Sequence, residues 1–241
     1  MLPPSFDARV TTTRALSPSV REIVFAREGG EPVVFEPGQW VSLVLPLPDG
    51  EIRRAYSIAS APEGASFEIA VTRVDEGLGS RHLHTLSAGD VVRVIGPQGF
   101  FTRPVAGGHP SLFVGTGTGV APLRSMIHAA ARAGDAAPLW LLFGGREEHD
   151  LLYADELRAL AETTPSVRIE QTLSRGSPTW SGRRGYVQHH ARALYEELSA
   201  KSAVAPHVYA CGLERMVGAV RTLFRQEVGL ARPLVHTERY D

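Results

Sequence analysis

The chain has 241 residues, of which 43% are hydrophobic and 21% are charged, proportions that are typical of a folded globular protein. Its formal net charge of −1 gives no electrostatic bias toward nucleic acid or an anionic membrane. The single cysteine, Cys211, excludes an intrachain disulfide and any four-cysteine iron–sulfur or zinc site.

The beginning of the chain carries no recognisable targeting signal. The first residues, MLPPSFDARVTTTRALS, contain no long apolar run of the kind found in signal peptides or transmembrane helices. We therefore expect a cytoplasmic protein with no membrane insertion.

Up to about residue 105 the apolar runs are short, rich in β-branched residues and separated by turn residues. Examples are residues 41–45 before PLPDG, residues 67–74, and residues 91–95 before GPQG. This spacing predicts an antiparallel β-barrel or sandwich. The only helix expected in this half is short, over residues 80–86, and it ends before Gly89-Asp90.

From residue 111 onward, predicted strands and helices alternate. Strands are expected at 111–114, 139–143, 167–173, 207–211 and 234–236, and helices at 121–133, 150–162, 187–198 and 213–227, with Asp150 capping the second helix. The alternation predicts a doubly wound α/β domain with a five-stranded parallel sheet. We place the boundary in residues 104–110, which gives domains 1–105 and 106–241.

A glycine-rich turn, Gly115-Thr116-Gly117-Thr118-Gly119, separates the first of these strands from its helix. Glycines let backbone N–H groups approach a phosphate, and the helix N-terminus adds a favourable field. The turn lacks the Gly-Lys-Ser/Thr ending of a P-loop and the G-x-G-x-x-G spacing of a Rossmann fold. It predicts a pyrophosphate site, with a purely structural tight turn as the alternative.

The run Arg54-Ala55-Tyr56-Ser57 combines a phosphate-binding residue type with a flat aromatic ring. On a strand, Arg54 and Tyr56 would point the same way because alternate residues share a face. The arginine can pair with a phosphate and the tyrosine offers a stacking surface. The alternative is an edge strand with one solvated arginine.

Gly77-Leu78-Gly79-Ser80 stands at the start of the short helix. Its backbone N–H groups and the Ser80 hydroxyl could hold a second phosphate. The alternative is a serine that simply caps its own helix.

Cys211 and Gly212 stand at the carboxyl end of a predicted parallel strand, the edge where ligands bind in open α/β sheets. The thiol can approach a bound ring there. The alternative is a small buried apolar residue.

Four arginines follow strands of the second half: Arg146, Arg175, Arg183 and Arg184. Together they would bind an added phosphate such as the 2′-phosphate that distinguishes NADP from NAD. Each alone is an ordinary solvated surface charge. The close histidine pairs, His82 with His84 and His189 with His190, lack the spacing and the acidic partner of a zinc hydrolase, so no metal site is predicted.

In order and spacing, RAYS, GLGS, GTGTGVAP and then Cys211-Gly212 with Met216 further on resemble the ferredoxin–NADP reductase superfamily over nearly the whole chain. The resemblance implies a flavin-binding β-barrel followed by a nucleotide-binding domain. It implies electron transfer between a nicotinamide nucleotide and a one-electron acceptor, with FAD rather than FMN as the flavin.

The resemblance also implies roles for the residues of these motifs. Arg54, Gly79 and Ser80 would contact the flavin pyrophosphate, Tyr56 would stack on the isoalloxazine, and Ser57 would lie near its N5 edge. Gly115, Thr116, Gly117, Thr118 and Gly119 would receive the nucleotide pyrophosphate, with Thr118 close to the nicotinamide. Cys211, followed by Gly212, would lie beside the nicotinamide ring.

Members that prefer NADP carry a Ser-Arg pair after the third strand of the nucleotide domain, which Ser174-Arg175 matches, and an arginine after the second, which Arg146 matches. The resemblance therefore favours NADPH over NADH. The chain ends in Glu238-Arg239-Tyr240-Asp241. Either Tyr240 covers the flavin or Glu238 is the acidic group near it.

Because a single cysteine cannot hold an iron–sulfur cluster, the one-electron acceptor must be a separate protein, such as a ferredoxin, a flavodoxin or an oxygenase component. A monomer is expected. Three alternatives stay open: a relay flavoprotein subunit of a larger complex, a simpler flavin or ferric reductase, and a nucleotide-binding module without redox turnover.

Overall fold

The computed structural model describes residues 3–47, 50–105 and 108–240. Two compact units make up the chain: Met1–Pro104 with Arg124–Ala129, and Val105–Leu123 with Ala130–Asp241. The predicted boundary segment includes residues 106 and 107, which lie outside the described residues. The division into domains 1–105 and 106–241 therefore stays a prediction.

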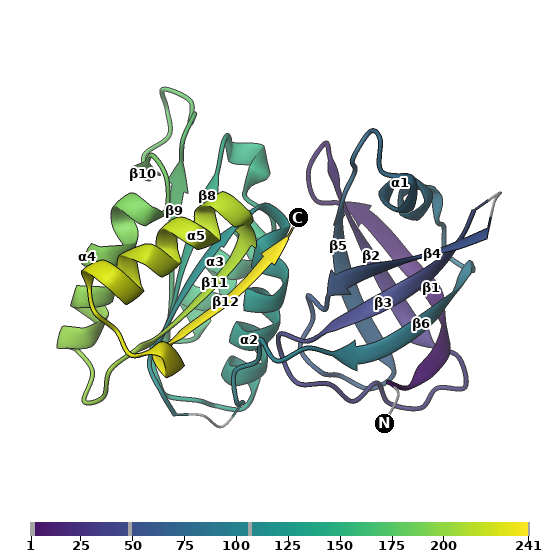
Figure 1. Ribbon diagram of the computed structural model, residues 1–241, viewed down its shortest axis with the longest axis horizontal. Helices are drawn as coiled ribbons and strands as arrows, with labels where there is room; N and C mark the ends of the chain where they lie inside the picture. Colours follow the sequence, from purple (N-terminus) through teal and green to yellow (C-terminus); the bar gives the residue numbers. More distant parts are fainter. Residues whose placement is uncertain (1–2, 48–49, 106–107, 241) are drawn as a thin grey trace. The chain divides into compact units, whose positions relative to one another are not determined.

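The first unit is built on an antiparallel sheet, as predicted (Figure 1). Its strands are β1 (Ser5–Ala15), β2 (Val20–Arg27), β3 (Trp40–Leu47), β4 (Gly50–Ser57), β5 (Ser66–Thr72) and β6 (Val91–Gln98), in the order β4-β3-β6-β1-β2-β5. Alternate residues of β3 show why the sheet forms: Val41, Leu43 and Leu45 are fully buried and belong to one apolar core. One face of each strand therefore enters a common apolar core.

Helix α1 (Leu78–Thr85) is the short helix expected in this half, and it begins two residues earlier than predicted. Leu83, together with Leu86 just beyond the helix, packs into the core of the first unit. Gly89 follows with φ +102°, a left-handed conformation that suits glycine, and leads the chain into β6.

The second unit contains a parallel sheet in the order β10-β9-β8-β7-β11-β12. The five predicted strands are present as β7 (Ser111–Thr116), β8 (Leu139–Gly145), β9 (Val167–Leu173), β11 (His207–Leu213) and β12 (Val235–Tyr240). The prediction of five strands missed β10 (Arg183–Arg184), which pairs with Thr172 and Leu173 at the sheet edge. A two-residue strand has no apolar periodicity that a sequence pattern can reveal.

Four helices connect the strands: α2 (Val120–Arg132), α3 (Ala154–Thr163), α4 (Gln188–Ala200) and α5 (Glu214–Thr222). Buried residues of α4 and α5 form one core with alternate residues of β7, β8 and β11. Figure 1 shows α3 on the other face of the sheet, as right-handed crossovers require. Short helical turns lie at Gly117–Gly119 (η1), Glu148–Asp150 (η2), Leu223–Glu227 (η3) and Arg232–Leu234 (η4).

Two helix predictions need correction. The helix expected over 150–162 begins only at Ala154, after Tyr153 with φ 59°. Asp150 does not cap it: its side chain forms a capping box with Glu147 around η2. The helix expected over 213–227 is α5 followed by a π-helical turn, η3.

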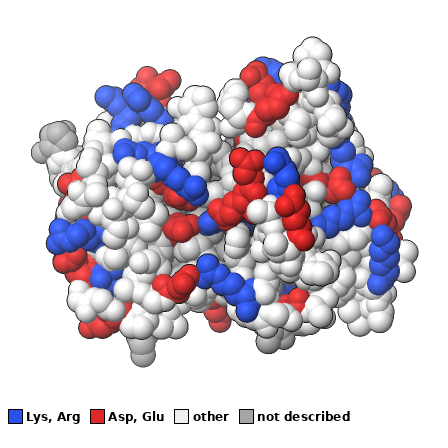
Figure 2. All heavy atoms as spheres, turned by 180° about the vertical axis from the view of Figure 1, so that it is seen from behind, with Lys and Arg blue, Asp and Glu red and all other residues white. Residues whose placement is uncertain are grey.

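The surface carries charges of both signs. Figure 2 shows basic and acidic side chains interspersed on the face that it displays. No helix among the described residues is both long and apolar enough to cross a membrane.

Candidate functional site

Arg54 and Tyr56 lie on the side of β4 that faces the barrel core. Tyr56 pairs with Val41 and Arg54 with Leu43 across the β3–β4 ladder, and both partners are buried. Tyr56 is half-buried against the core, and this burial raises the pKa of its phenol to about 12, a rise that the charge of Arg54 partly offsets. The ring is therefore neutral at physiological pH and offers a flat apolar surface.

Gly79 brings the second motif against the first. A Cβ on Gly79 would lie 2.9 Å from Cγ of Arg54 and 3.3 Å from Cδ1 of Ile52. Such a contact is too close for any side chain, so only glycine lets α1 approach β4 to this extent. The RAYS and GLGS motifs, which lie apart in the sequence, thus form one local cradle.

The start of α1 exposes backbone donors rather than the Ser80 hydroxyl. The N–H of Arg81 makes the first intrahelical bond, to the carbonyl of Gly77 at 3.0 Å, so the N–H groups of Leu78, Gly79 and Ser80 precede the helical ladder. The Ser80 hydroxyl accepts from Val74 N at 3.1 Å and donates to Gly77 O at 3.1 Å. Because Gly77 is the N-cap residue, Ser80 does not cap the helix but braces the turn before it.

In the second unit, the glycine-rich turn fits closely against the end of β11. A Cβ on Gly119 would lie 2.3 Å from the carbonyl oxygen of Cys211, and one on Gly212 would lie 2.6 Å from Oγ1 of Thr116. Gly117, in η1, has φ +55°, and a Cβ built on it would have no atom within 4 Å. The turn therefore presents exposed backbone beside the carboxyl ends of β7 and β11.

Thr116 supplies an observation that points to a ligand. Its Oγ1 is buried and has no hydrogen-bond partner among the described residues. A buried polar group left without a partner costs about 1–3 kcal/mol, which a polar ligand at this position would recover. The residues of the turn therefore fit a bound nucleotide. Thr118, half-buried in η1, stays a predicted contact.

Cys211 is completely buried at the end of β11. Burial raises the pKa of its thiol far above the ordinary value, and the nearby carboxylate of Glu238 raises it further. The β11–β12 register explains this proximity, because Cys211 pairs with Glu238 and Leu213 with Tyr240. The thiol therefore stays protonated and is not a nucleophile. Asp241, whose role the sequence left open, lies outside the described residues.

Two of the four predicted phosphate-binding arginines lie together. The N–H of Arg175 donates to the carbonyl of Arg146 at 2.7 Å, and Ser174 N donates to Gly145 O at 3.1 Å. Both arginines are exposed, and neither forms an ion pair within the described residues. The Asp150 carboxylate accepts a hydrogen bond from Arg146 N at 3.0 Å and so shapes this loop. The sequence-based prediction that Asp150 caps the next helix is wrong.

The other two arginines have internal partners. Arg183 lies in β10 rather than in a loop, and its Nε is 2.9 Å from Oε2 of Glu170. Arg184 donates to the carbonyls of Gly176, Ser177 and Trp180 at 2.7–3.1 Å. The predicted four-arginine cluster is therefore divided into one exposed pair and two arginines that hold the loop before α4.

In the two close histidine pairs, His84 Nε2 lies 2.9 Å from Val71 O and His190 Nε2 lies 2.9 Å from Arg184 O. No group of three His, Cys, Asp or Glu side chains in the described part of the chain is arranged to hold a metal ion. Sequence reasoning missed a histidine cluster at the amino ends of the strands. There His207 Nδ1 lies 3.0 Å from His236 Nε2, and His109 Nε2 lies 3.1 Å from the Tyr209 hydroxyl.

Comparison with known proteins agrees with this arrangement. The oxidoreductase FAD-binding domain model matches residues 7–102, and the oxidoreductase NAD-binding domain model matches residues 113–222. The chain is 58% identical to ferredoxin–NADP reductase B of Sorangium cellulosum over 98% of both chains. It is 30% identical to the toluate 1,2-dioxygenase electron transfer component of Pseudomonas putida, covering 92% of this chain and 64% of that protein.

Solved structures show the same fold. The Amycolatopsis cytochrome P450 reductase GcoB superimposes with a TM-score of 0.84 at 29% identity, over 98% of this chain and 70% of that one. A ferredoxin NADP⁺ reductase from Neisseria gonorrhoeae gives a TM-score of 0.82 at 21% identity, over 98% of each chain. With the end-to-end match to the Sorangium protein, these findings establish that the chain belongs to the ferredoxin–NADP reductase family of flavoprotein oxidoreductases.

Proposed function

We propose that this chain transfers electrons between NADPH and a separate one-electron carrier through bound FAD. The observation that carries the proposal is the match to ferredoxin–NADP reductase B, which extends over 98% of both chains at 58% identity. Such a reaction requires the protein to bind the phosphates of both the flavin and the nicotinamide nucleotide. Each unit has one candidate site for them.

Flavin, when bound, supplies the chemistry that couples two-electron hydride transfer to one-electron release. The protein's part is to bind and to orient. Arg54 and the free N–H groups at the start of α1 hold the flavin phosphates, and Gly79 keeps these two elements close enough to act together. The neutral ring of Tyr56 stacks on the flavin, and the buried Ser57 follows it at the strand end.

The nucleotide is held by the turn from Gly115 to Gly119. Its backbone N–H groups meet the pyrophosphate, and Thr116 Oγ1 gains the partner that it lacks. Cys211 and Gly212 provide a close, uncharged surface for the nicotinamide, since the thiol stays protonated. Orientation of this kind contributes to rate by holding the reactants in a productive arrangement.

The 2′-phosphate of NADPH is bound by Arg146 and Arg175, with Ser174 beside them. Two exposed guanidinium groups that form no ion pair within the described residues attract a dianionic phosphate, and the backbone hydrogen bond that joins their loops keeps the loops together. NADH offers them only a hydroxyl. Arg183 is not included because its guanidinium is already held by Glu170.

The last strand completes the site. Of the two assignments that the sequence offers for this strand, we retain Glu238, whose carboxylate lies near the Cys211 thiol, as the acidic group near the nicotinamide. The acceptor is a soluble ferredoxin or flavodoxin, and the enzyme works as a cytoplasmic monomer.

An anaerobic titration of the purified protein tests the proposal. NADPH should bleach the visible flavin band much faster than NADH does. Equal rates would remove the 2′-phosphate assignment and leave the reaction intact. A protein that binds no flavin, even after reconstitution, would overturn the proposal.

A second function is favoured by the relatives that are electron-transfer components of oxygenases, such as the toluate dioxygenase component. In this case the chain would deliver electrons to an oxygenase. The chain spans 64% of that component's length, so the acceptor must be found by experiment. Reduction of a ferredoxin, of a flavodoxin, and of free flavin or ferric chelate, compared under the same conditions, separates these possibilities.

A further inference from the structure

Residues 58–60, which directly follow Ser57 at the end of β4, are fixed against the neighbouring strand β5. Ile58 forms a single bridge with that strand, and Ala59 N donates a hydrogen bond to the carbonyl of Glu68 at 2.7 Å. Ile58 and Ala59 are both completely buried. The position of these three residues, which we call the strand-end segment, therefore determines where β4 and Ser57 come to rest.

The strand-end segment is also held from a second direction, by side chains of α2. Arg124 Nη1 donates to the carbonyl of Ala59 at 2.8 Å, and Ser125 Oγ donates to the carbonyl of Ser60 at 2.6 Å. All four residues belong to the first unit, with which Arg124–Ala129 of α2 is grouped. Buried carbonyls need hydrogen-bond partners, and here a helix far along the chain supplies them.

Arg124 is a charged residue in a buried position. It is 8% exposed, and its Nη1 also lies 2.6 Å from Oε2 of Glu68. The cost of taking both charges out of water offsets much of their attraction, so an apolar pair of the same size is often at least as stabilising. Arg124 meets two acceptors on two elements, β5 and the strand-end segment. Its contacts therefore suit a role in fixing position better than a role in adding stability.

The same helix begins at the proposed nucleotide site. Helix α2 starts at Val120, directly after the turn from Gly115 to Gly119. Arg124 lies four residues further on, about 6 Å along the helix axis, and Ser125 follows it. One helix therefore carries both the end of the nucleotide turn and the two donors that hold the strand-end segment.

We propose that Arg124 and Ser125 are positioning residues for hydride transfer. By holding the strand-end segment, they fix Ser57 and the neighbouring Tyr56 ring relative to the helix that follows the nucleotide turn. The proposal rests on the proposed function, because it takes Tyr56 and Ser57 as flavin contacts. Loss of either donor should cost rate rather than binding, because the reacting atoms must be held about 3–3.5 Å apart in a productive arrangement.

The test separates the rate of hydride transfer from binding. Anaerobic stopped-flow reduction of the holoenzyme at a series of NADPH concentrations gives a limiting rate and a Kd. Ser125→Ala and Arg124→Gln should each lower the limiting rate by roughly tenfold or more, because a misplacement of about 1 Å can cost 10²-fold. The Kd for NADPH and the flavin content should be unchanged. The visible circular dichroism of the bound flavin, which depends on the surroundings of its ring, should change in both variants.

Two further variants distinguish position from stability. Arg124→Lys should recover most of the limiting rate, because a single nitrogen, Nη1, makes the contacts to Ala59 and Glu68 and an ammonium group can replace it. Arg14→Gln is the matched control. Arg14 also pairs with a glutamate of the first unit, the buried Glu22, but it lies in β1, which β3 and β6 separate from β4 in the sheet. This control should lower the thermal midpoint and leave the limiting rate and the flavin dichroism unchanged.

Ser125→Ala removes a single oxygen atom, so it tests the proposal even where Arg124→Gln folds poorly. An unchanged limiting rate in Ser125→Ala and Arg124→Gln would overturn the inference. An equal loss of rate in Arg14→Gln would also overturn it, as would a loss that a weaker Kd for NADPH explains entirely. Release of flavin from both variants would contradict it too, because the cradle of Arg54 and α1 is intact in them. A wild-type holoenzyme that neither NADPH nor NADH reduces would instead overturn the proposed function.

Discussion

Gly119 and Cys211 approach so closely that no side chain fits between them. A Cβ on Gly119 would lie 2.3 Å from the carbonyl oxygen of Cys211 and 2.6 Å from Cα of Gly212. Both obstacles are backbone, so a new methyl group can be accommodated only if the turn or the end of β11 moves. The proposed nucleotide pyrophosphate and nicotinamide contacts meet at this point.

Gly119→Ala should therefore impair the nucleotide site more than the flavin site. We expect reduction by NADPH to slow by at least about tenfold and stability to fall by about 1–3 kcal/mol, the cost of overpacking. Flavin content should be unchanged. Stopped-flow reduction and thermal unfolding measure the two effects. Gly218→Ala is the control, since a Cβ on Gly218 in α5 meets nothing within 4 Å and alanine favours a helix. Similar behaviour of the two variants would contradict the role of close approach.

Tyr56 should hold flavin through its ring rather than through its hydroxyl. Tyr56→Phe should retain flavin, and Tyr56→Ala should release it, because only the latter removes the stacking surface. Flavin content after purification and gel filtration checks this. Unchanged flavin content in the alanine variant would refute the stacking assignment.

The same residue should affect stability at alkaline pH. Its pKa of about 12 in the folded protein exceeds the ordinary value of 10.0, so the folded state retains a proton that the unfolded state loses. The corresponding stability is present below pH 10 and is lost as pH rises toward 12. Unfolding measured between pH 9 and about 11 should show a shallower decline in Tyr56→Phe than in the wild type. Parallel declines would contradict the pKa shift.

Arg175 should discriminate NADPH from NADH. Arg175→Gln should raise KM for NADPH by roughly 10–100-fold, the range for a lost charge-assisted hydrogen bond, with little change for NADH. Arg183→Gln should have a much smaller effect on the preference because Glu170 already holds that side chain. Arg158→Gln, at an exposed position in α3, is the control. Equal effects of the Arg175 and Arg183 substitutions would show that Arg183 also belongs to the 2′-phosphate site.

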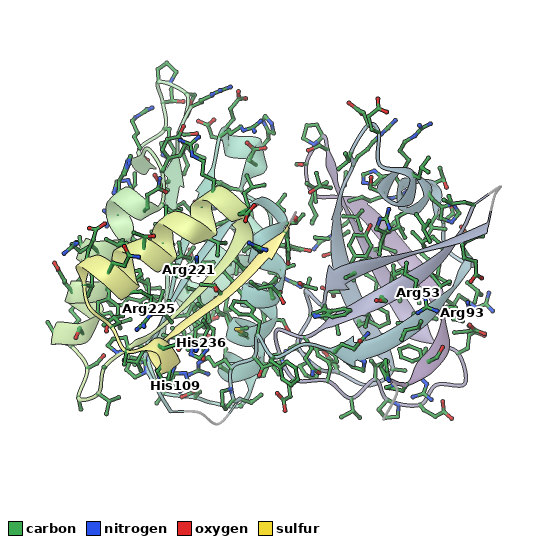
Figure 3. All side chains as sticks on the ribbon, viewed as in Figure 1. Arg53, Arg93, His109, Arg221, Arg225 and His236 are labelled. Atoms are coloured by element: carbon green, nitrogen blue, oxygen red, sulfur yellow. The ribbon has the colours of Figure 1, made fainter. Side chains whose placement is uncertain are left out.

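His236 should make the protein sensitive to acid. Burial and the neighbouring His207 lower the pKa of His236 to about 4 in the folded protein, below its ordinary value of 6.5. Its contribution to stability is therefore complete above pH 6.5 and is lost as pH falls toward 4. Figure 3 shows His109 and His236 at the same end of the second unit, and the His236 ring stacks on Tyr209 with centroids 4.3 Å apart.

His236→Phe keeps an aromatic ring in the stack, and it removes the titrating group together with its contact to His207 Nδ1. We expect the thermal midpoint of this variant to fall less than that of the wild type between pH 7 and about pH 5. His149→Phe, an exposed histidine of η2, should leave the wild-type pH dependence unchanged. If the thermal midpoint of His236→Phe falls as much as that of the wild type, another group must cause the acid sensitivity.

The sequence by itself determined most strands and helices, though not β10 or all of the helix bounds, and it located the glycine turn. Apolar alternation of period two, as in Val41, Leu43 and Leu45, requires a strand with one buried face. The same periodicity placed Arg54 and Tyr56 on one side of β4 before any contact was known. These are local properties, because the chain geometry fixes which neighbours share a face.

Only the tertiary structure decided which polar groups meet. Four arginines looked alike in the sequence, yet Arg183 pairs with Glu170 while Arg146 and Arg175 stay exposed beside each other. Likewise Asp150 closes η2 rather than capping α3, and the Ser80 hydroxyl braces its own turn. A hydroxyl or charged group has several acceptors or partners within reach, and the strand register and loop path select among them. That selection depends on residues far apart in the sequence, which no local pattern records.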